Sequence, residues 1–567
     1  MIECPNCRSN LKFNVALQAL ACEHCDSQFG VHAFDGQGGA VEDDSYEVTI
    51  FTCPQCAGEL YTTDTSATAF CSFCGASNIL ESRIEKELRP KFIIPFQKTK
   101  TDCKTAYLKM MKSAIFAPKE LKEEKYIDSF RGIYMPYWLY SVRQQKAIEL
   151  EGKKERRSGD YIITKHYALR ADLNAQYKGM SYDASSSFAD NISEKLAPFN
   201  VKQMYEFTPA YLSGFYADTA DVPSHLYEDE IKITAAQRTF KYVKKDSTFS
   251  KYDITHSDSS LVNRFGTVVE EAERAMFPVW FLAYRNQDRV AYATVNGQTG
   301  KVVADLPVDI KKYLIGTVAL AIPIFILLNL FFTVTPKVLL AVIAVISAIV
   351  AIMHASEMKQ IVKQEGYEDD KGANHLMEIK KEQQEKEKWL QQPEIAATIE
   401  AGEDVEEAWN AELMRRGYRK QQQKDKESKS SGVAMKVVKI VLIYCVLSFV
   451  LPLFVTLFAF LSRDVGLAVT AVITGVISLV AYFNSFKHGK KLKNPDRIAK
   501  SLYCVIAIGL MLVLAIWSPA HDAFYYVTAT IALVAVFCTL MDLIKKYNVL
   551  ATRPSPQFDY KGGDDHA

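Results

Sequence analysis

The hydrophobic pattern divides the chain into a mixed N-terminal part and a strongly apolar C-terminal part. Six apolar segments each approach the roughly 20 residues that cross a bilayer as a helix. They span 313–332, 337–355, 437–461, 465–486, 501–517 and 523–544. We therefore expect about six transmembrane helices: a hairpin over 313–355 and four helices over 437–544.

Charged residues dominate the segment between these two groups. Residues 356–434 are dense in Glu, Lys and Gln, with opposite charges three or four positions apart. That spacing supports a solvated helix. We expect a charged helical loop over 356–434, and a polar acidic tail over 545–567.

Lysine and arginine residues orient the six predicted spans. They gather before the first span, between the fourth and fifth, and after the last: Lys311, Lys312, Lys487, Lys490, Lys491, Lys493, Arg497, Lys500, Lys545, Lys546 and Arg553. Short loops rich in Lys and Arg stay on the cytoplasmic side. The pattern predicts a multi-pass membrane protein with both termini cytoplasmic.

The predicted spans contain few polar groups. We count Lys439 and Asp542, near span ends, as their ionisable side chains, and Asn329 and Asn484 as lone amides. Pumps and ion-coupled carriers usually need charges within the membrane. We therefore interpret the helices as an anchor or packing platform, with a transporter or channel as an alternative.

Residues 88–310 have the mixed periodicity of an α+β domain. Residues 100–116 show helical spacing at Ala106, Met110, Met111 and Ile115, and residues 130–150 are rich in aromatic and β-branched residues, as strands are. "YMPYWL" (134–139) matches "MFPVWF" (276–281) at Pro and Trp. This weak repeat indicates two related strand layers, with Trp138 and Trp280 as core anchors.

The segment "VNGQTGK" suggests a phosphate loop at first sight. Its spacing is GxxGK rather than GxxxxGK[ST], and no helical pattern follows. Asn296 and Gly297 tolerate the positive φ of a tight turn. We predict a β-hairpin there.

Two groups of four cysteines give the clearest chemical signal. Each is a CxxC pair, fourteen residues and a second CxxC pair, and the second group repeats the first at a constant offset of 49. The first group is Cys4, Cys7, Cys22 and Cys25; the second is Cys53, Cys56, Cys71 and Cys74. Four thiolates suit tetrahedral zinc. We predict two duplicated zinc ribbons, over 1–30 and 49–80.

A Cys4 site has no open coordination position, so we expect both zinc ions to be structural. Iron in a rubredoxin-like site is the chemical alternative. Thioredoxin-like redox chemistry fits less well, because neither CxxC pair lies in a βαβ pattern. His24 is interpreted as an exposed neighbour. The N-terminus lacks an apolar signal-peptide region, which favours a reducing compartment.

These motifs together resemble bacterial TFIIB-type zinc-ribbon membrane proteins, sometimes mislabelled as primosomal helicase-like. The similarity lies in the cysteine groups and in "RPKFIIPF", "GIYMPYWLY", "YLSGFYAD", "FPVWFLAY" and "NGQTGKVVADLP", over roughly residues 1–355. Proteins of this kind are associated with membrane-stress systems containing phage-shock-protein-A-like and stomatin/flotillin-like proteins. The resemblance implies a membrane-bound recruiter of protein partners in the bacterial cell (inner) membrane.

Composition and motifs argue against several classes of function. A net charge of +1 indicates no general affinity for nucleic acid, and GxSxG, HExxH and Walker motifs are absent. The second cysteine group has no basic residue between Cys53 and Cys74. We therefore expect a non-enzymatic membrane scaffold that contacts lipid and protein partners. A membrane-tethered nucleic-acid-binding protein is the other alternative, and oligomeric state is left open.

Overall fold

The structure is a computed structural model that divides into two compact units. The first comprises Met1–Lys312, Tyr367–Leu376 and Ala551–Ala567; the second comprises Tyr313–Gly366 and Met377–Leu550. The residues it describes are 2–34, 45–55, 58–62, 71, 73, 81–254, 258–286, 289–331, 335–368, 370–391, 409, 464–492, 494–495 and 497–552. The predicted span over 437–461 lies outside them.

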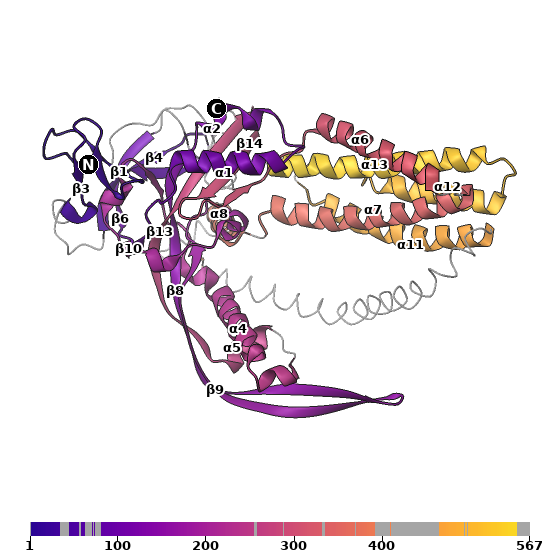
Figure 1. Ribbon diagram of the computed structural model, residues 1–567, viewed down its shortest axis with the longest axis horizontal. Helices are drawn as coiled ribbons and strands as arrows, with labels where there is room; N and C mark the ends of the chain where they lie inside the picture. Colours follow the sequence, from indigo (N-terminus) through magenta and orange to yellow (C-terminus); the bar gives the residue numbers. More distant parts are fainter. Residues whose placement is uncertain are drawn as a thin grey trace. The chain divides into compact units, whose positions relative to one another are not determined.

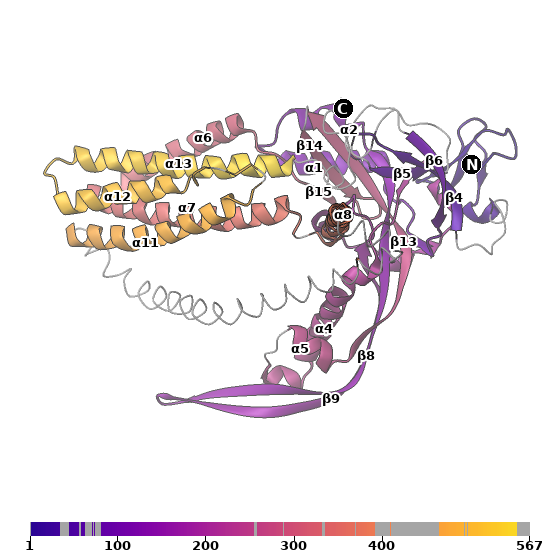
Figure 2. The same ribbon diagram turned by 180° about the vertical axis from the view of Figure 1, so that it is seen from behind.

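The first unit is built on two antiparallel-rich sheets. The small one joins β1 (Leu11–Asn14), β2 (Ala19–Cys22) and β3 (Gln28–Phe29). The large one has twelve described strands (Figures 1 and 2); eight follow the path β10-β7-β13-β8-β11-β5-β4-β6, and four more pair beside this path. The strands of this path are β10 (Tyr205–Glu206), β7 (Phe92–Ile93), β13 (Thr267–Asn286), β8 (Arg131–Ser158), β11 (Tyr216–Asp218), β5 (Glu59–Thr62), β4 (Ser45–Thr52) and β6 (Glu81–Leu88).

The two Pro-Trp repeats form neighbouring strands of this sheet. β8 pairs antiparallel with β13, so that Tyr134 lies opposite Pro278 and Trp138 opposite Arg274. The expectation of two strand layers is therefore wrong: the copies lie side by side within one layer. Trp280 is buried as a core anchor, while Trp138 is half-buried and donates its indole N–H to the Val222 carbonyl at 2.7 Å.

Alternate residues of β8 and β13 face two different cores, because side chains of a strand point alternately to its two faces. Tyr134, Met276 and Trp280 lie in one core. Their neighbours in the sequence lie in the other: Ile133, Met135, Tyr137, Ala275, Phe277, Val279 and Phe281. The centre of the sheet is therefore buried on both faces.

Helix α1 (Lys100–Ser113) confirms the helix expected over 100–116. Thr99 caps its N-terminus in a capping box with Asp102. The buried face carries Cys103, Tyr107 and Met111. Ile115 lies beyond the helix end and is exposed, because the chain leaves the helix before that position.

The predicted hairpin is confirmed, but the positive φ of its turn falls on Gly300 (78°) rather than on Asn296 or Gly297. β14 (Arg289–Asn296) pairs antiparallel with β15 (Val302–Ala304). The Asn296 side-chain oxygen accepts backbone N–H bonds from Gln298 and Thr299, both at 2.9 Å. These bonds fix the turn with groups of the turn itself.

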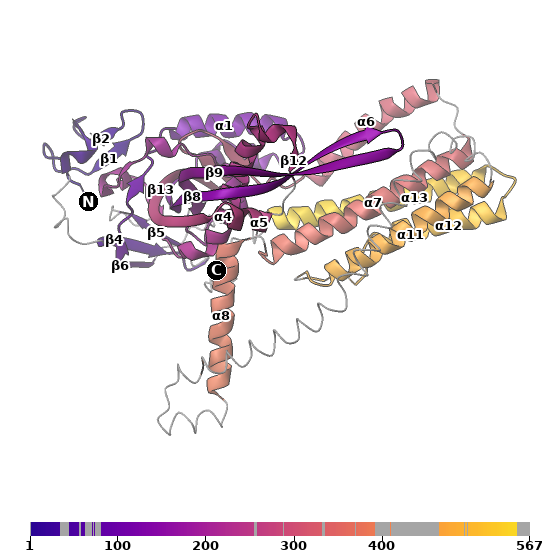
Figure 3. The same cartoon turned by 90° about the horizontal axis from the view of Figure 1, so that it is seen from below.

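β8 continues far beyond the sheet as a hairpin with β9 (Tyr161–Asp183), as Figure 3 shows. Helices α4 (Glu228–Lys245) and α5 (Asp258–Arg264) pack against it through Ile148, Leu150 and Leu169. The remaining elements of this unit are β12 (Asp253–Ile254), α2 (Glu124–Ile127), α3 (Asp190–Leu196) and six short 3-10 helices.

The second unit contains apolar helices. Four described helices are long and apolar enough to cross a membrane, and a fifth apolar helix is shorter. The four are α6 (Ile310–Phe331), α7 (Pro336–Glu365), α11 (Asp464–Gly489) and α13 (Ala523–Ala551); the shorter one is α12 (Leu502–Trp517). Helix α8 (Lys371–Leu390) lies within the segment expected to be a charged helical loop.

Helices α7, α11, α12 and α13 lie side by side (Figure 1) and pack through small side chains. Ala344, Ala507 and Ala532 are among the buried residues of this core. Small residues allow helix backbones to approach closely, which is how helices associate in lipid. The described side chains of α6, by contrast, are half-buried or exposed.

Candidate metal centre and buried charged groups

The first cysteine group is positioned by the β1–β2 hairpin. Cys4 and Cys7 precede β1, and Cys22 is the last residue of β2, opposite Leu11 in the register. Cys25 follows one turn later. The hairpin therefore carries one CxxC pair at the start of its first strand and the other at the end of its second.

Both CxxC turns have the same backbone geometry. Arg8 and Asp26, each four residues after the first cysteine of its pair, donate their N–H groups to the Cys4 and Cys22 carbonyls at 2.8 and 3.1 Å. Both residues adopt positive φ, 62° and 56°. Non-glycine residues rarely adopt positive φ, and short polar side chains such as Asp tolerate it best.

The four sulfur atoms converge. The Sγ atoms of Cys4 and Cys25 are 3.6 Å apart, those of Cys7 and Cys22 are 3.4 Å apart, and all four lie within 4.8 Å of one another. Zinc with Zn–S bonds of about 2.3 Å holds its tetrahedral sulfurs about 3.8 Å apart, whereas a disulfide needs about 2 Å. The group is shaped to hold a metal ion with four protein ligands.

Local hydrogen bonds favour the thiolate form that a metal requires. The Ser27 hydroxyl lies 3.1 Å from the Cys25 sulfur. This bond, with the Ser27 backbone N–H and the Cys7 thiol, lowers the pKa of Cys25 to about 6. Thiolates are the metal-binding form of cysteine. His24 is exposed, as expected.

The β1–β2 hairpin is docked on the large sheet. Phe13 of β1 is buried, and its ring meets Tyr211 edge-on at 5.3 Å between centroids. Its backbone N–H donates to the Ser213 carbonyl at 2.9 Å. Gln18 donates to the Phe96 carbonyl at 2.7 Å. The metal centre is thus attached to the core that contains Phe96 and Tyr134.

Only part of the second cysteine group lies among the described residues. Cys53 and Cys71 are buried, in the core on the opposite face of the sheet from the first hairpin. The Cys53 N–H donates to the Gly58 carbonyl at 3.0 Å, which repeats the bond from Cys4 to the Ser9 carbonyl at an offset of 49. Cys56 and Cys74 lie outside the described residues, so the second zinc site stays a prediction.

Sequence reasoning missed a buried polar cluster among the apolar helices. His354 of α7 is fully buried. Its Nδ1 lies 2.7 Å from the Ser485 Oγ of α11, and its Nε2 lies 3.1 Å from the Asp542 Oδ2 of α13. Lys546 pairs with the same carboxylate. The expectation of spans without ionisable interior groups is therefore wrong at His354.

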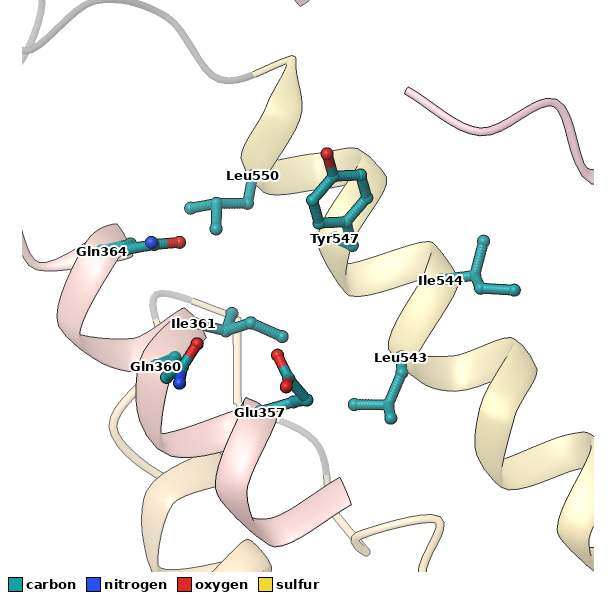
Figure 4. A pocket seen from close by; sticks show the side chains of 8 residues that line it. All are labelled: Glu357, Gln360, Ile361, Gln364, Leu543, Ile544, Tyr547 and Leu550. Carbon is teal, nitrogen blue, oxygen red and sulfur yellow. The ribbon is translucent and has the colours of Figure 1, made fainter. Parts of the chain in front are cut away.

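A shallow cavity of about 330 Å³ lies one turn farther along the same two helices (Figure 4). α7 contributes the polar side chains of Glu357, Gln360 and Gln364, while α13 contributes Leu543, Ile544 and Leu550, with Tyr547 beside them. α7 also contributes the apolar Ile361, so its wall is mixed, whereas the α13 wall is mostly apolar.

A second missed cluster contains three buried aspartates of the first unit. Asp183 ends β9, Asp190 begins α3, and Asp370 precedes α8. Tyr227 donates to Asp190 at 2.8 Å, and the Lys371 N–H donates to the same carboxylate at 2.8 Å. Asp370 in turn accepts from the Asp190 N–H at 3.3 Å. Segment 367–376 is thus bound to the first unit through acidic side chains.

Burial and neighbouring carboxylates change the titration of this cluster. Burial, together with Asp190 and Asp370, raises the pKa of Asp183 well above its ordinary value. Two adjacent carboxyl groups in one buried site cannot both ionise cheaply. Asp183 therefore keeps its proton to a higher pH than an ordinary aspartate does.

The two missed clusters differ in the signal that the sequence carries for them. His354 stands inside an apolar run and is detectable once histidine is counted as ionisable. The three aspartates carry no such signal, because Asp370 is 180 residues from Asp190 in the sequence.

Comparison with known proteins gives one distant relative. No family model and no solved structure matches the chain. A protein of Bacillus subtilis (strain 168), named "Uncharacterized protein YdjG", is 27% identical over 321 residues, which cover 55% of this chain and 91% of that protein. Its name assigns no activity to it.

Proposed function

We propose that the chain is a non-enzymatic, multi-pass membrane scaffold whose zinc-stabilised cytoplasmic unit binds protein partners. The first cysteine group carries this proposal. Its four sulfurs lie within 4.8 Å of one another, so a bound zinc ion is fully coordinated by protein. A metal without an open position stabilises a fold and leaves no site for a reacting molecule.

The attachment of the metal hairpin to the large sheet supports a rigid platform. Phe13, Leu11 and Leu20 are buried in the same core as Phe96 and Tyr134. A zinc ion that fixes β1 and β2 also fixes the surface around them. The four helices long enough to cross a membrane support the anchor, and the Lys-rich turns favour a cytoplasmic platform in the inner membrane.

The partner class follows from the resemblance to zinc-ribbon proteins of membrane-stress systems. We propose phage-shock-protein-A-like or stomatin/flotillin-like proteins as partners. A platform anchored by helices would meet partners of this class at the membrane.

Affinity purification of the full chain in detergent tests the proposal. Cys4→Ser with Cys22→Ser removes two ligands of the first site, and Cys538→Ser, at an exposed position of α13, is the matched control. We expect the double variant to lose about one zinc ion per chain together with a partner of the proposed class. The control should keep both.

Two outcomes would contradict the proposal. One is an unchanged partner set despite loss of the metal, which would separate recruitment from the zinc site. The other is a fully folded unit at the same unfolding temperature without metal. Metal analysis and thermal unfolding of each variant distinguish these results from simple misfolding.

The buried histidine cluster favours transport as a second candidate. Ionisable groups inside membrane helices often mark proton or ion pathways, and His354 contacts side chains of two other helices. Proton flux into liposomes containing the full chain tests this candidate. Flux that His354→Leu abolishes would support it, and flux equal to that of empty liposomes would dismiss it.

A further inference from the structure

The hairpin of β8 and β9 ends in a ribbon with exposed side chains. Residues 153–166 are all exposed. The last strand beside them is β12, which pairs with Gly152 and Lys153. Residues 154–165, the hairpin tip, therefore extend about 17 Å beyond this contact at about 3.3 Å per residue.

A tight turn fixes the shape of the hairpin tip. Ser158 pairs with Tyr161 across a two-residue turn, in which Gly159 adopts a φ of +62°. Glycine at this position suits the turns that match the twist of the flanking strands. Arg157 donates to the Gly159 carbonyl at 3.2 Å. The register of the tip is therefore defined up to its last residue.

Three consecutive apolar residues follow the turn. Tyr161, Ile162 and Ile163 are 78%, 68% and 47% exposed. Consecutive residues of a strand point to opposite faces, so the apolar side chains occupy both faces at the end of the ribbon. A flat partner on one face would leave Ile162 or its two neighbours uncovered. If the end of the ribbon instead inserts into its binding partner, all three side chains are covered.

Basic residues stand directly behind this apolar end. Segment 153–165 has five basic residues against two acidic ones. Lys154 lies opposite Lys165, and Arg156 lies opposite Ile163 on the same face. Like charges directly opposite each other destabilise a strand pair. Within the described part of the chain, Lys154, Arg156 and Lys165 have no ion-pair partner to offset this repulsion.

We propose that the hairpin tip binds the surface of a bilayer containing anionic phospholipids. Tyr161, Ile162 and Ile163 enter the interface between headgroups and acyl chains, where aromatic and aliphatic side chains are favourable. Lys154, Arg156 and Lys165 remain at the depth of the lipid phosphates, whose charge relieves the repulsion between the two lysines. Each basic residue near such a surface contributes to binding.

This order of groups favours lipid over a nucleic acid or an acidic protein. A phosphate backbone attracts the basic residues but offers nothing to three aliphatic and aromatic side chains at the very end. The inference rests on the membrane location in the proposed function, but not on zinc or on partner recruitment.

Fluorescence quenching by brominated lipids tests the proposal on the full chain in nanodiscs. Ile162→Trp places a reporter at the tip, and the signal of the unsubstituted chain is subtracted for its five tryptophans. We expect at least twofold quenching of the added tryptophan when the nanodisc, or an added vesicle, contains brominated phosphatidylglycerol. The quenching should weaken as salt is raised.

Two matched controls make the result specific. Tyr242→Trp reports from α4, at a side chain 70% exposed, and should show no quenching. In the Ile162→Trp chain, Lys154→Glu with Lys165→Glu should remove at least half of the quenching. Lys241→Glu with Lys245→Glu, on exposed positions of α4, makes the same charge change and should leave it intact.

The outcomes separate lipid binding at the tip from the proposed scaffold function. No quenching in nanodiscs or with vesicles would overturn lipid binding, and equal quenching by brominated phosphatidylcholine alone would overturn the proposed role of anionic lipid. Protection of the introduced tryptophan only on addition of DNA or of a second copy of the chain would overturn it as well. Failure of the chain to enter nanodiscs at all would count against the membrane anchor instead.

Discussion

Replacing Asp183 with asparagine tests how the buried acids hold segment 367–376. Asp183 is 2% exposed, and burial together with Asp190 and Asp370 raises its pKa. Asparagine has nearly the same shape but no charge at any pH. The substitution therefore removes the titration while it largely retains the packing.

The sign of the effect follows from the raised pKa. The folded unit keeps a proton on Asp183 that the unfolded chain releases above about pH 3.9. The contribution of Asp183 to the free energy of unfolding is therefore complete below that pH. It decreases as the pH rises toward the folded pKa. The decrease is at most about 1.4 kcal/mol per pH unit, and it ends where the pH reaches the folded pKa.

Hydrogen exchange of segment 367–376 measures this effect in the detergent-solubilised chain. In the unsubstituted protein, protection corrected for intrinsic exchange should fall between pH 4.5 and 7. In Asp183→Asn it should be nearly independent of pH and higher at pH 7. Asp253→Asn, at an exposed position, should behave like the unsubstituted protein.

Two results would refute this reasoning. One is an unchanged pH slope in Asp183→Asn, which would assign the titration to another group. The other is loss of protection at every pH, which would mean that the Asp183 carboxylate itself holds the segment.

Three further substitutions test the packing. Phe13→Ala should lower the stability of the first unit by about 3–5 kcal/mol and leave the metal content unchanged. Thermal unfolding and metal analysis would measure these two quantities, and an unchanged unfolding temperature would contradict the docking of the β1–β2 hairpin. Gly132→Ala places a Cβ 2.4 Å from the Phe215 ring and should cost about 1–3 kcal/mol by overpacking, whereas a neutral result in thermal unfolding would show that the ring can move. His354→Leu should cost about 1–3 kcal/mol because Asp542 loses a buried partner, and an unfolding temperature in detergent equal to that of the unsubstituted chain would dismiss the cluster as a stabilising contact.

Local patterns in the sequence predicted local structure well. The β-branched and aromatic run over 130–150 became part of β8, and the helical spacing over 100–116 became α1. The spacing of Cys4, Cys7, Cys22 and Cys25 predicted their convergence. In each case the residues that decide the structure are neighbours in the chain, or are brought together by one hairpin.

Long-range pairings were not predictable in the same way. The antiparallel pairing of β8 with β13 joins Trp138 to Arg274, and nothing in the repeat itself distinguishes one layer from two. The contact of Asp190 with Asp370 depends on the course of the chain between them. Such contacts follow from the packing of the whole unit rather than from any periodicity.

X-ray absorption at the zinc edge tests the metal centre, on which the proposed function depends, most directly. The measurement uses the purified full chain with Cys53, Cys56, Cys71 and Cys74 replaced by serine, so that the first cysteine group alone contributes. We predict one zinc ion per chain with four sulfur ligands at about 2.3 Å. A metal-free chain with disulfide-bonded Cys4 or Cys22, or zinc bound mainly through nitrogen or oxygen, would contradict this prediction.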